Sequence, residues 1–287
     1  MVTTADELNE RGRGLAEAGL PVEAEAAYRQ AIEADAQWSV PHYNIGLLFK
    51  YQGRWQDSLA ANRNAVERDG SDTDAWWNLG IAATALGDWQ TARQAWFRCG
   101  VVVPDGEGAP RCDYGAVPLR LNPDADGEVV WGDRLDPARA VVKNIPLVSS
   151  GYFWGDLVLH DGAAVGTRKL HGRDVPVFNV LQLLERSPFG TFEIRAEIRD
   201  IADLALLSEV AAEIGGAAED WSTAVSVLCR ACSDGTPHHV HDTDARASDL
   251  PCAVAALNEE QCDRMLQEWH RRAPHVQVVE RRRVAPP

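Results

Sequence analysis

The sequence has no apolar run that approaches the roughly 20 residues needed to cross a bilayer. Its first residues, Met1 to Arg13, are polar and acidic and lack the apolar segment of an export signal. Lysine is also scarce: the chain has three, Lys50, Lys143 and Lys169, and acidic residues outnumber basic ones, with a formal net charge of -15. Nucleic-acid binding depends on clustered Lys and Arg. We therefore expect a cytoplasmic protein that binds neither a membrane nor a nucleic acid.

Cysteine is scarce as well, with six residues in a chain of 287. Because no export signal is present, these cysteines are expected to be reduced thiols or metal ligands and not a disulfide framework. An apolar fraction of 45% and a charged fraction of 25% exclude a disordered chain. The length is sufficient for two or three compact units.

A period of 34 residues runs through the first third of the chain. It is carried by four columns of small residues: Gly12, Gly46 and Gly80; Gly19, Gly53 and Gly87; Ala24, Ser58 and Ala92; Ala31, Ala65 and Cys99. Each period predicts two helices that approach closely at the small residues and are joined by a turn at a glycine. Such a fixed period indicates stacked helical repeats.

These repeats resemble the tetratricopeptide repeat family. The third unit follows the family pattern most plainly, at Trp76-x2-Leu79-Gly80, Gly87-Asp88-Trp89, Ala92-x3-Trp96 and Pro104. The second unit departs from it at His42 in the tryptophan column, Asn62 in an aromatic column and Gly70 where proline is usual. The first unit lacks the closing proline and keeps Leu8, Gly12, Ala24 and Tyr28. The resemblance covers residues 4–105 and implies a three-repeat α-solenoid domain over residues 1–105.

In this family the first helices of successive repeats line a groove that accepts a peptide. The positions expected to face it here are Asn9, Arg13, Tyr43, Asn44, Leu47, Lys50, Tyr51, Trp77, Asn78 and Ile81. Asn44 and Asn78 share one column, and an asparagine can donate to and accept from a peptide backbone at once. The alternative is that these asparagines bond only to neighbouring helices. Trp77 is the best candidate for an anchor.

Some members of the family bind a C-terminal carboxylate with lysine, arginine and asparagine at set positions. This sequence supplies Asn9, Asn44 and one cation, Arg13. It has Asp74 and Asn78 in the third unit, where further cations would be needed. We therefore do not expect carboxylate recognition. No additional closing helix is predicted after Pro104, so the last face of the stack is expected to pack against the chain that follows.

Beyond the repeats the pattern changes from helices to strands. Residues 106–127 are rich in Gly, Pro and Asp and are predicted to be a linker or extension. Residues 128–188 predict a β-meander or small barrel, with hairpin turns at Asp161-Gly162 and Gly172. Its expected strands are Glu128–Trp131, Ala140–Ile145, Asp156–His160, Ala163–Leu170 and Val175–Leu183. His160 and His171 lie next to these turns and are expected to be exposed.

Residues 189–287 alternate strands and helices. Phe192, Ile194, Ala196 and Ile198 form the apolar side of a first strand, and Asp200 begins a helix that Gly215-Gly216 ends. A second strand is predicted at Thr223–Cys229. The strand–helix–strand order is then predicted a second time, with strand Cys252–Leu257, a helix capped by Asn258 and strand Val276–Arg281. This βαβ-βαβ order is most economically a ferredoxin-like sandwich, a fold that does not determine function.

One segment of this part gathers cysteine and histidine as a zinc site would. The candidate ligands are Cys229, Cys232, His238, His239, His241 and Cys252. Zinc takes thiolate and imidazole ligands in tetrahedral sites, with two residues between paired cysteines. A structural zinc site and a metal-free polar loop are both open. A reactive dithiol is disfavoured because no helix follows to lower the thiol pKa.

The sequence therefore predicts a cytoplasmic adaptor that binds a protein or peptide through its repeats, with a possible structural zinc site. The alternative is a metal-dependent enzyme or regulator that acts from the C-terminal half, with the repeats as a docking arm. Metal content distinguishes the two. Neither the partner nor the oligomeric state is predicted.

Overall fold

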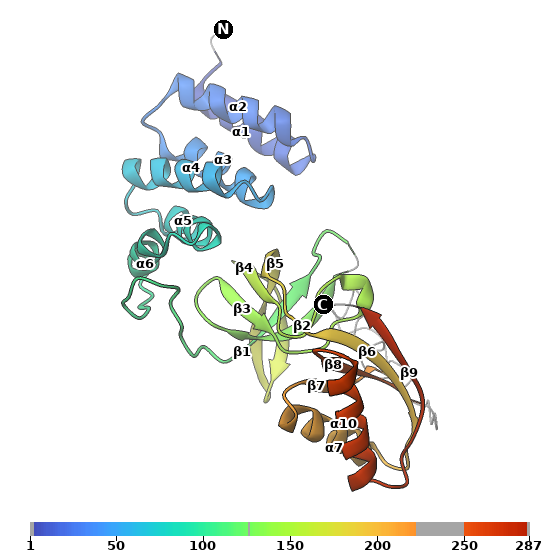
Figure 1. Cartoon of the computed structure of the whole chain (residues 1–287). Helices are drawn as coiled ribbons and strands as arrows, with labels where there is room; N and C mark the ends of the chain where they lie inside the picture. The colour runs from blue at the N-terminus through green and yellow to red at the C-terminus, as the bar shows by residue number, and fades with distance from the viewer. Residues whose placement is uncertain (1–2, 126, 222–249, 286–287) are drawn as a thin grey trace. The chain divides into compact units, whose positions relative to one another are not determined.

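The structure is a computed structural model that describes residues 3–125, 127–221 and 250–285. The chain divides into two compact units (Figure 1). The helical unit comprises Met1–Asp113 together with Leu135–Arg139. The sheet-rich unit comprises Tyr114–Arg134 and Ala140–Pro287. In the described ranges no helix is long and apolar enough to span a bilayer.

The helical unit consists of three antiparallel helix pairs (Figure 1). They are α1 Ala5–Glu17 with α2 Pro21–Ala34, α3 Ser39–Tyr51 with α4 Trp55–Arg68, and α5 Thr73–Leu86 with α6 Trp89–Arg98. Side chains that accept hydrogen bonds from backbone amides begin three of the helices, at Thr4, Asp72 and Asp88. The turns between paired helices contain Gly19, Gly53 and Gly87, each with φ near +70°. That backbone conformation favours glycine, as the 34-residue period predicts.

The small-residue columns let the paired helices approach closely. A Cβ atom at Gly80 would lie 2.6 Å from the ring of Trp96. In the second pair a Cβ atom at Gly46 would lie 2.7 Å from Nδ2 of Asn62. Asn62 donates to the carbonyl of Ser58 at 2.9 Å, while its Oδ1 is buried and has no hydrogen-bond partner among the residues that the structure describes. The second repeat therefore keeps the family spacing but has a polar side chain where the others have an aromatic ring.

The last helix pair is covered by irregular chain. Arg93 of α6 donates to the carbonyls of Pro104, at 2.9 Å, and Gly108, at 2.7 Å. Arg139 is buried over the ring of Trp89, 4.7 Å from its centroid. Its guanidinium donates to Pro110 O at 2.7 Å and pairs with the buried Asp136 at 2.5 Å. These segments pack against the final helix within the helical unit.

The first part of the sheet-rich unit is a closed five-stranded barrel. Its strands are β1 Ala116–Leu121, β2 Glu128–Arg134, β3 Arg139–Val142, β4 Leu157–Leu170 and β5 Arg173–Glu185. Closure comes from β1, which pairs antiparallel with β2 and parallel with β5. The segment 106–127, expected to be a linker, therefore contains a barrel strand. Local patterning could not identify it because its partner β5 lies about 60 residues away in sequence.

The predicted hairpin at Asp161-Gly162 is wrong. These residues lie inside β4, where the register with β5 shifts between His160 and Ala164. Asp161 is buried, and its carboxylate accepts the amide of Gly162 at 2.7 Å. The same bulge buries His160, which stacks on Phe178 with ring centroids 5.4 Å apart. The expectation of an exposed His160 is therefore also wrong, whereas His171 is exposed in the β4–β5 turn.

The second part of this unit is a four-stranded antiparallel sheet with the order β7-β8-β6-β9. Its elements are β6 Gly190–Glu197, α7 Ile201–Glu213, β7 Ala217–Asp220, β8 Leu250–Ala256, α10 Glu259–Arg272 and β9 Gln277–Ala285 (Figure 1). The strand predicted at Thr223–Cys229 lies outside the described residues. Strand β7 begins instead directly after Gly215-Gly216, which had been expected only to end the helix.

Both faces of this sheet are covered. On one face α7 and α10 bury Phe192, Ile194, Leu207, Met265 and Trp269. The opposite face carries Ala253 and Ala255, which pack with Ile145 and Trp221. Trp221 Nε1 donates to Ile145 O at 3.0 Å. The segment after β3 therefore joins the barrel to the sheet within one unit.

Candidate partner-binding face

The first helices of the three pairs, α1, α3 and α5, lie beside one another. We call their common surface the first-helix face, and the ten residues predicted to bind a partner all lie on these three helices. Tyr51 is 60% exposed, and so is the side chain of Arg13. The half-buried members are Tyr43, Asn44, Leu47 and Trp77. The buried members are Asn9, Lys50, Asn78 and Ile81.

Hydrogen bonds between side chains connect the three first helices. Asn44 Nδ2 donates to Asn9 Oδ1 at 2.9 Å, joining α3 to α1. Lys50 Nζ donates to Asn78 Oδ1 at 3.0 Å, joining α3 to α5. Lys50 also lies over the ring of Tyr51, 4.6 Å from its centroid. The asparagines thus each make a hydrogen bond to a neighbouring helix.

Each of these asparagines uses one amide atom in that way. Within the described ranges, Nδ2 of Asn9, Oδ1 of Asn44 and Nδ2 of Asn78 make no hydrogen bond, and none is sealed from solvent. An asparagine amide offers two donor hydrogens and an acceptor oxygen. The inter-helix bonds therefore orient the three amides and leave a donor, an acceptor and a donor for another molecule.

Trp77 lies next to this polar row on α5. Its ring meets Trp96 edge to face, with centroids 5.1 Å apart. Its Nε1 is buried and has no partner among the described residues. Buried indole N–H groups usually find an acceptor. Trp77 is therefore held at the half-buried border of the face with its donor unused.

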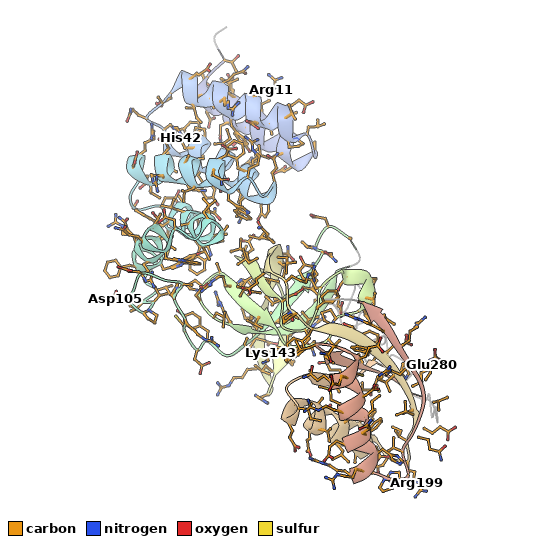
Figure 2. All side chains as sticks on the ribbon, viewed as in Figure 1. Arg11, His42, Asp105, Lys143, Arg199 and Glu280 are labelled. Carbon is orange, nitrogen blue, oxygen red and sulfur yellow. The ribbon has the colours of Figure 1, made fainter. Side chains whose placement is uncertain are left out.

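Few cations lie on the first-helix face. Arg13 forms an ion pair with Glu10 at 2.5 Å. Asp74, at a position where carboxylate-binding relatives need a cation, is exposed. Asn78, at the other such position, is neutral and bonds to Lys50. His42 of α3, labelled in Figure 2, is buried, and desolvation followed by the charge of Arg68 lowers its pKa.

The predicted zinc ligands fall into two groups. Cys229, Cys232, His238, His239 and His241 lie outside the described residues. Cys252 is buried in β8, where its thiol donates to Ile194 O at 3.5 Å, and burial raises its pKa to about 12. Across 3–125, 127–221 and 250–285, no group of three His, Cys, Asp or Glu side chains is arranged to hold a metal.

Two carboxyl groups of the sheet-rich unit were missed by the sequence analysis. Glu128 begins β2, and burial raises its pKa to about 7. Glu219 of β7 also has a raised pKa because of burial. It accepts hydrogen bonds from Asn144 and from the amide of Ile145, the latter at 2.8 Å. A signal existed at Glu128, where a single charged residue precedes Val-Val-Trp in a strand.

The comparisons with known proteins concern the helical unit. The sequence model of the tetratricopeptide repeat family matches residues 43–99. The second tetratricopeptide domain of Spaghetti (RPAP3), solved with the HSP90 peptide SRMEEVD, is 24% identical, with a TM-score of 0.33. The match covers 33% of this chain and 89% of that one.

The Sgt2 domain from Aspergillus fumigatus is 20% identical over 33% of this chain and 63% of its own, with a TM-score of 0.32. MamA is 20% identical over 34% of this chain and 57% of its own, with the same TM-score, 0.32. No curated protein matches the chain. The family match falls on the second and third helix pairs, where the glycine turns and close helix contacts have the family spacing. The N-terminal helices of this chain are therefore tetratricopeptide repeats.

Proposed function

We propose that this protein is a protein-interaction adaptor that holds an extended peptide segment of a partner on its first-helix face. The observation that carries the proposal is the row of amide groups on Asn9, Asn44 and Asn78. Each amide is oriented by one hydrogen bond and keeps its other atom available. An extended peptide presents alternating carbonyl and amide groups, which match such a row of donors and acceptors.

Aromatic side chains next to the row supply apolar contact area. Tyr43, Tyr51 and Trp77 retain exposed surface on the same face, and residues of these types contribute most to interface affinity. Tyr and Trp also lose little conformational entropy on binding. We infer that the polar row sets the register of the peptide and that the aromatic residues provide most of the binding energy.

The proposed ligand differs from the peptide named with the Spaghetti (RPAP3) structure. SRMEEVD carries acidic residues and ends in a carboxylate. Here Asp74 and Asn78 occupy positions where cations would be required, and Arg13 is paired with Glu10. A terminal carboxylate beside Asp74 would be repelled. We therefore propose an internal peptide segment as the partner.

This proposal is tested by measuring how much bound partner is recovered with variants of the first helices and with a variant of a second helix. Trp77→Ala and Asn44→Ala should each reduce recovery of the bound protein at least several-fold from matched extracts. Phe97→Ala is the control, because Phe97 is an aromatic residue that is 72% exposed and belongs to α6, a second helix of a pair. Far-UV circular dichroism checks that each variant is folded. Equal recovery from all three variants would exclude the first-helix face.

For the sheet-rich unit we propose a ferredoxin-like sandwich and a structural zinc site. The strand order β7-β8-β6-β9 with α7 and α10 on one face supports the sandwich. The zinc proposal relies on the sequence of Cys229, Cys232 and the three histidines. Cys252 fits it less well, because a zinc thiolate would have to form inside the core. The cytoplasmic location also stays a proposal.

Metal analysis of the purified protein tests the zinc site. We expect about one zinc per chain, lost in a Cys229→Ser, Cys232→Ser double variant and retained in Cys112→Ser. Zinc that is absent from the wild-type protein, with a melting temperature unaffected by chelator, would contradict the proposal. It would also remove the residues on which the alternative, a metal-dependent enzyme or regulator, depends.

A further inference from the structure

A cavity of about 340 Å³ opens beside the barrel, between the β1–β2 connection and the 3-10 turn η1 at Val148–Ser150. Its wall includes Asn122, Glu128, Leu147, Ser149 and Ser150. All of these residues belong to the sheet-rich unit. The cavity is thus built from the sheet-rich unit and is independent of the function proposed for the repeats.

The carboxylate of Glu128 is partly buried, yet few hydrogen-bond donors reach it. Both of its oxygens accept from one amide, that of Leu147, at 3.2 and 3.1 Å. No other donor reaches it in the part of the chain that the structure describes. Glu219 differs, because its two oxygens have separate donors in Asn144 and Ile145. A carboxylate can accept about four hydrogen bonds, so Glu128, a residue of the cavity wall, retains acceptor capacity.

The other polar groups of the cavity wall are also acceptors. Asn122 donates its Nδ2 to Ser150 O at 2.8 Å, which leaves Oδ1 as the available amide atom. Ser150 Oγ is already used, donating to Leu147 O at 2.8 Å and accepting from the amide of Tyr152 at 3.2 Å. Ser149 is exposed at the cavity wall and offers its hydroxyl. The site therefore combines one carboxylate with two neutral oxygens.

We propose that this cavity binds a primary ammonium group. Three N–H donors of an ammonium ion match the carboxylate of Glu128, Oδ1 of Asn122 and the hydroxyl of Ser149. The attached carbon chain would lie along Leu147 and Ala125. A hard metal cation fits less well, since Ca²⁺ takes six to eight oxygen ligands and usually several carboxylates. The source of the ammonium is either a free small amine or a lysine side chain.

The electrostatics of Glu128 predict how binding depends on pH. Burial raises its pKa to about 7, the amide of Leu147 lowers it, and the charge of Glu219 raises it again. An ammonium ion favours the ionised carboxylate, so binding releases a proton wherever Glu128 is protonated beforehand. Affinity should therefore fall about tenfold for each pH unit below 7 and level off above it.

Titration of the full chain with n-propylammonium chloride, followed by calorimetry at pH 8.5 and 5.5, tests the site. We expect saturable binding at pH 8.5 that weakens by at least tenfold at pH 5.5. Glu128→Gln should lose binding at least tenfold and Ser149→Ala several-fold. Glu185→Gln, at an exposed glutamate, should bind as the wild type does. Glu128→Asp, which keeps the charge, should retain part of the affinity.

Further ligands identify what is recognised. Nα-acetyl-lysine methylamide tests whether the bound ammonium belongs to a lysine side chain. Tighter binding of this compound than of n-propylammonium would identify lysine as the source, and the reverse order would identify a free small amine. Equal binding of uncharged n-propanol, tighter binding of Ca²⁺ than of either amine, or unchanged affinity in a folded Glu128→Gln variant would each overturn the proposal. Absence of binding by both amines at pH 8.5 would overturn it as well.

Discussion

The contacts that hold the helical unit together and those that hold the sheet-rich unit together join residues at different separations along the sequence. In the helical unit the close approach within each helix pair joins residues that are near in sequence, as at Gly80 and Trp96, which are 16 residues apart. The same contact recurs with each 34-residue period. In the sheet-rich unit, β1 closes the barrel on β5, and Trp221 bonds to Ile145, 76 residues away. Repetition makes the first kind of contact visible in a single sequence, whereas the second kind occurs once.

The two units also differ in their buried ionisable groups. In the described helical unit the buried titratable residue with a lowered pKa is His42. The sheet-rich unit also has a buried histidine with a lowered pKa, His160, which burial lowers to about 4. It has in addition three carboxyl groups with raised pKa values, Glu128, Asp156 and Glu219, and burial is the main cause for each. The buried histidines should therefore give both units a loss of stability toward acid pH, and the carboxyl groups should give the sheet-rich unit an additional loss as pH rises. Single variants can separate these contributions.

The larger expected effect is in the sheet-rich unit. The pKa of Glu128 is about 7 in the folded chain and ordinarily 4.5. Between these pH values Glu128 is therefore protonated in the folded state and ionised in the unfolded state. The contribution of Glu128 to stability therefore falls as pH rises from about 4.5 through 7. Glu128→Gln should remove this loss, a gain of up to about 3 kcal/mol above pH 7 and little at pH 4. Protection factors of β2 and β5 amides, measured by hydrogen exchange at both pH values, check it.

The smaller expected effect is in the helical unit and has the opposite sign. The pKa of His42 is lowered from 6.5, so the unfolded chain takes up a proton first as pH falls. Its contribution to stability is present above pH 6.5 and is lost as pH falls toward the folded pKa. Protection factors in α3 should therefore decrease between pH 7 and 5 in the wild type and less in His42→Phe. An equal decrease of α3 protection in the wild type and in His42→Phe would contradict the assignment of this pH response to His42.

Particular residues show how far the sequence could be interpreted. The turns between paired helices could be predicted at Gly19, Gly53 and Gly87, because a positive φ is a local requirement that glycine meets. Asp161-Gly162 has equally strong turn chemistry, yet it forms a bulge because β4 continues its pairing with β5 past it. Asp-Gly favours a local backbone shape, and tertiary pairing determines whether the chain reverses there.

The candidate site shows a similar limit. The period placed Asn9, Asn44 and Asn78 on one face, but it could not tell which amide atom each would commit to a neighbouring helix. That depends on helix spacing, which lets Asn44 reach Asn9 and Lys50 reach Asn78. Glu128 was missed for a related reason: its burial arises from Leu147 and η1, about 20 residues further along the chain.

The most direct test of partner binding through the first-helix face compares two exposed aromatic positions. Tyr51 lies on that face and is 60% exposed, while Phe97 lies on α6 and is 72% exposed. A photo-crosslinking amino acid is placed at one position or the other of the full chain in cells, and covalent adducts are analysed. The proposal predicts a discrete partner adduct from position 51 and none of that partner from position 97. The same partner captured from position 97 and not from position 51 would contradict it.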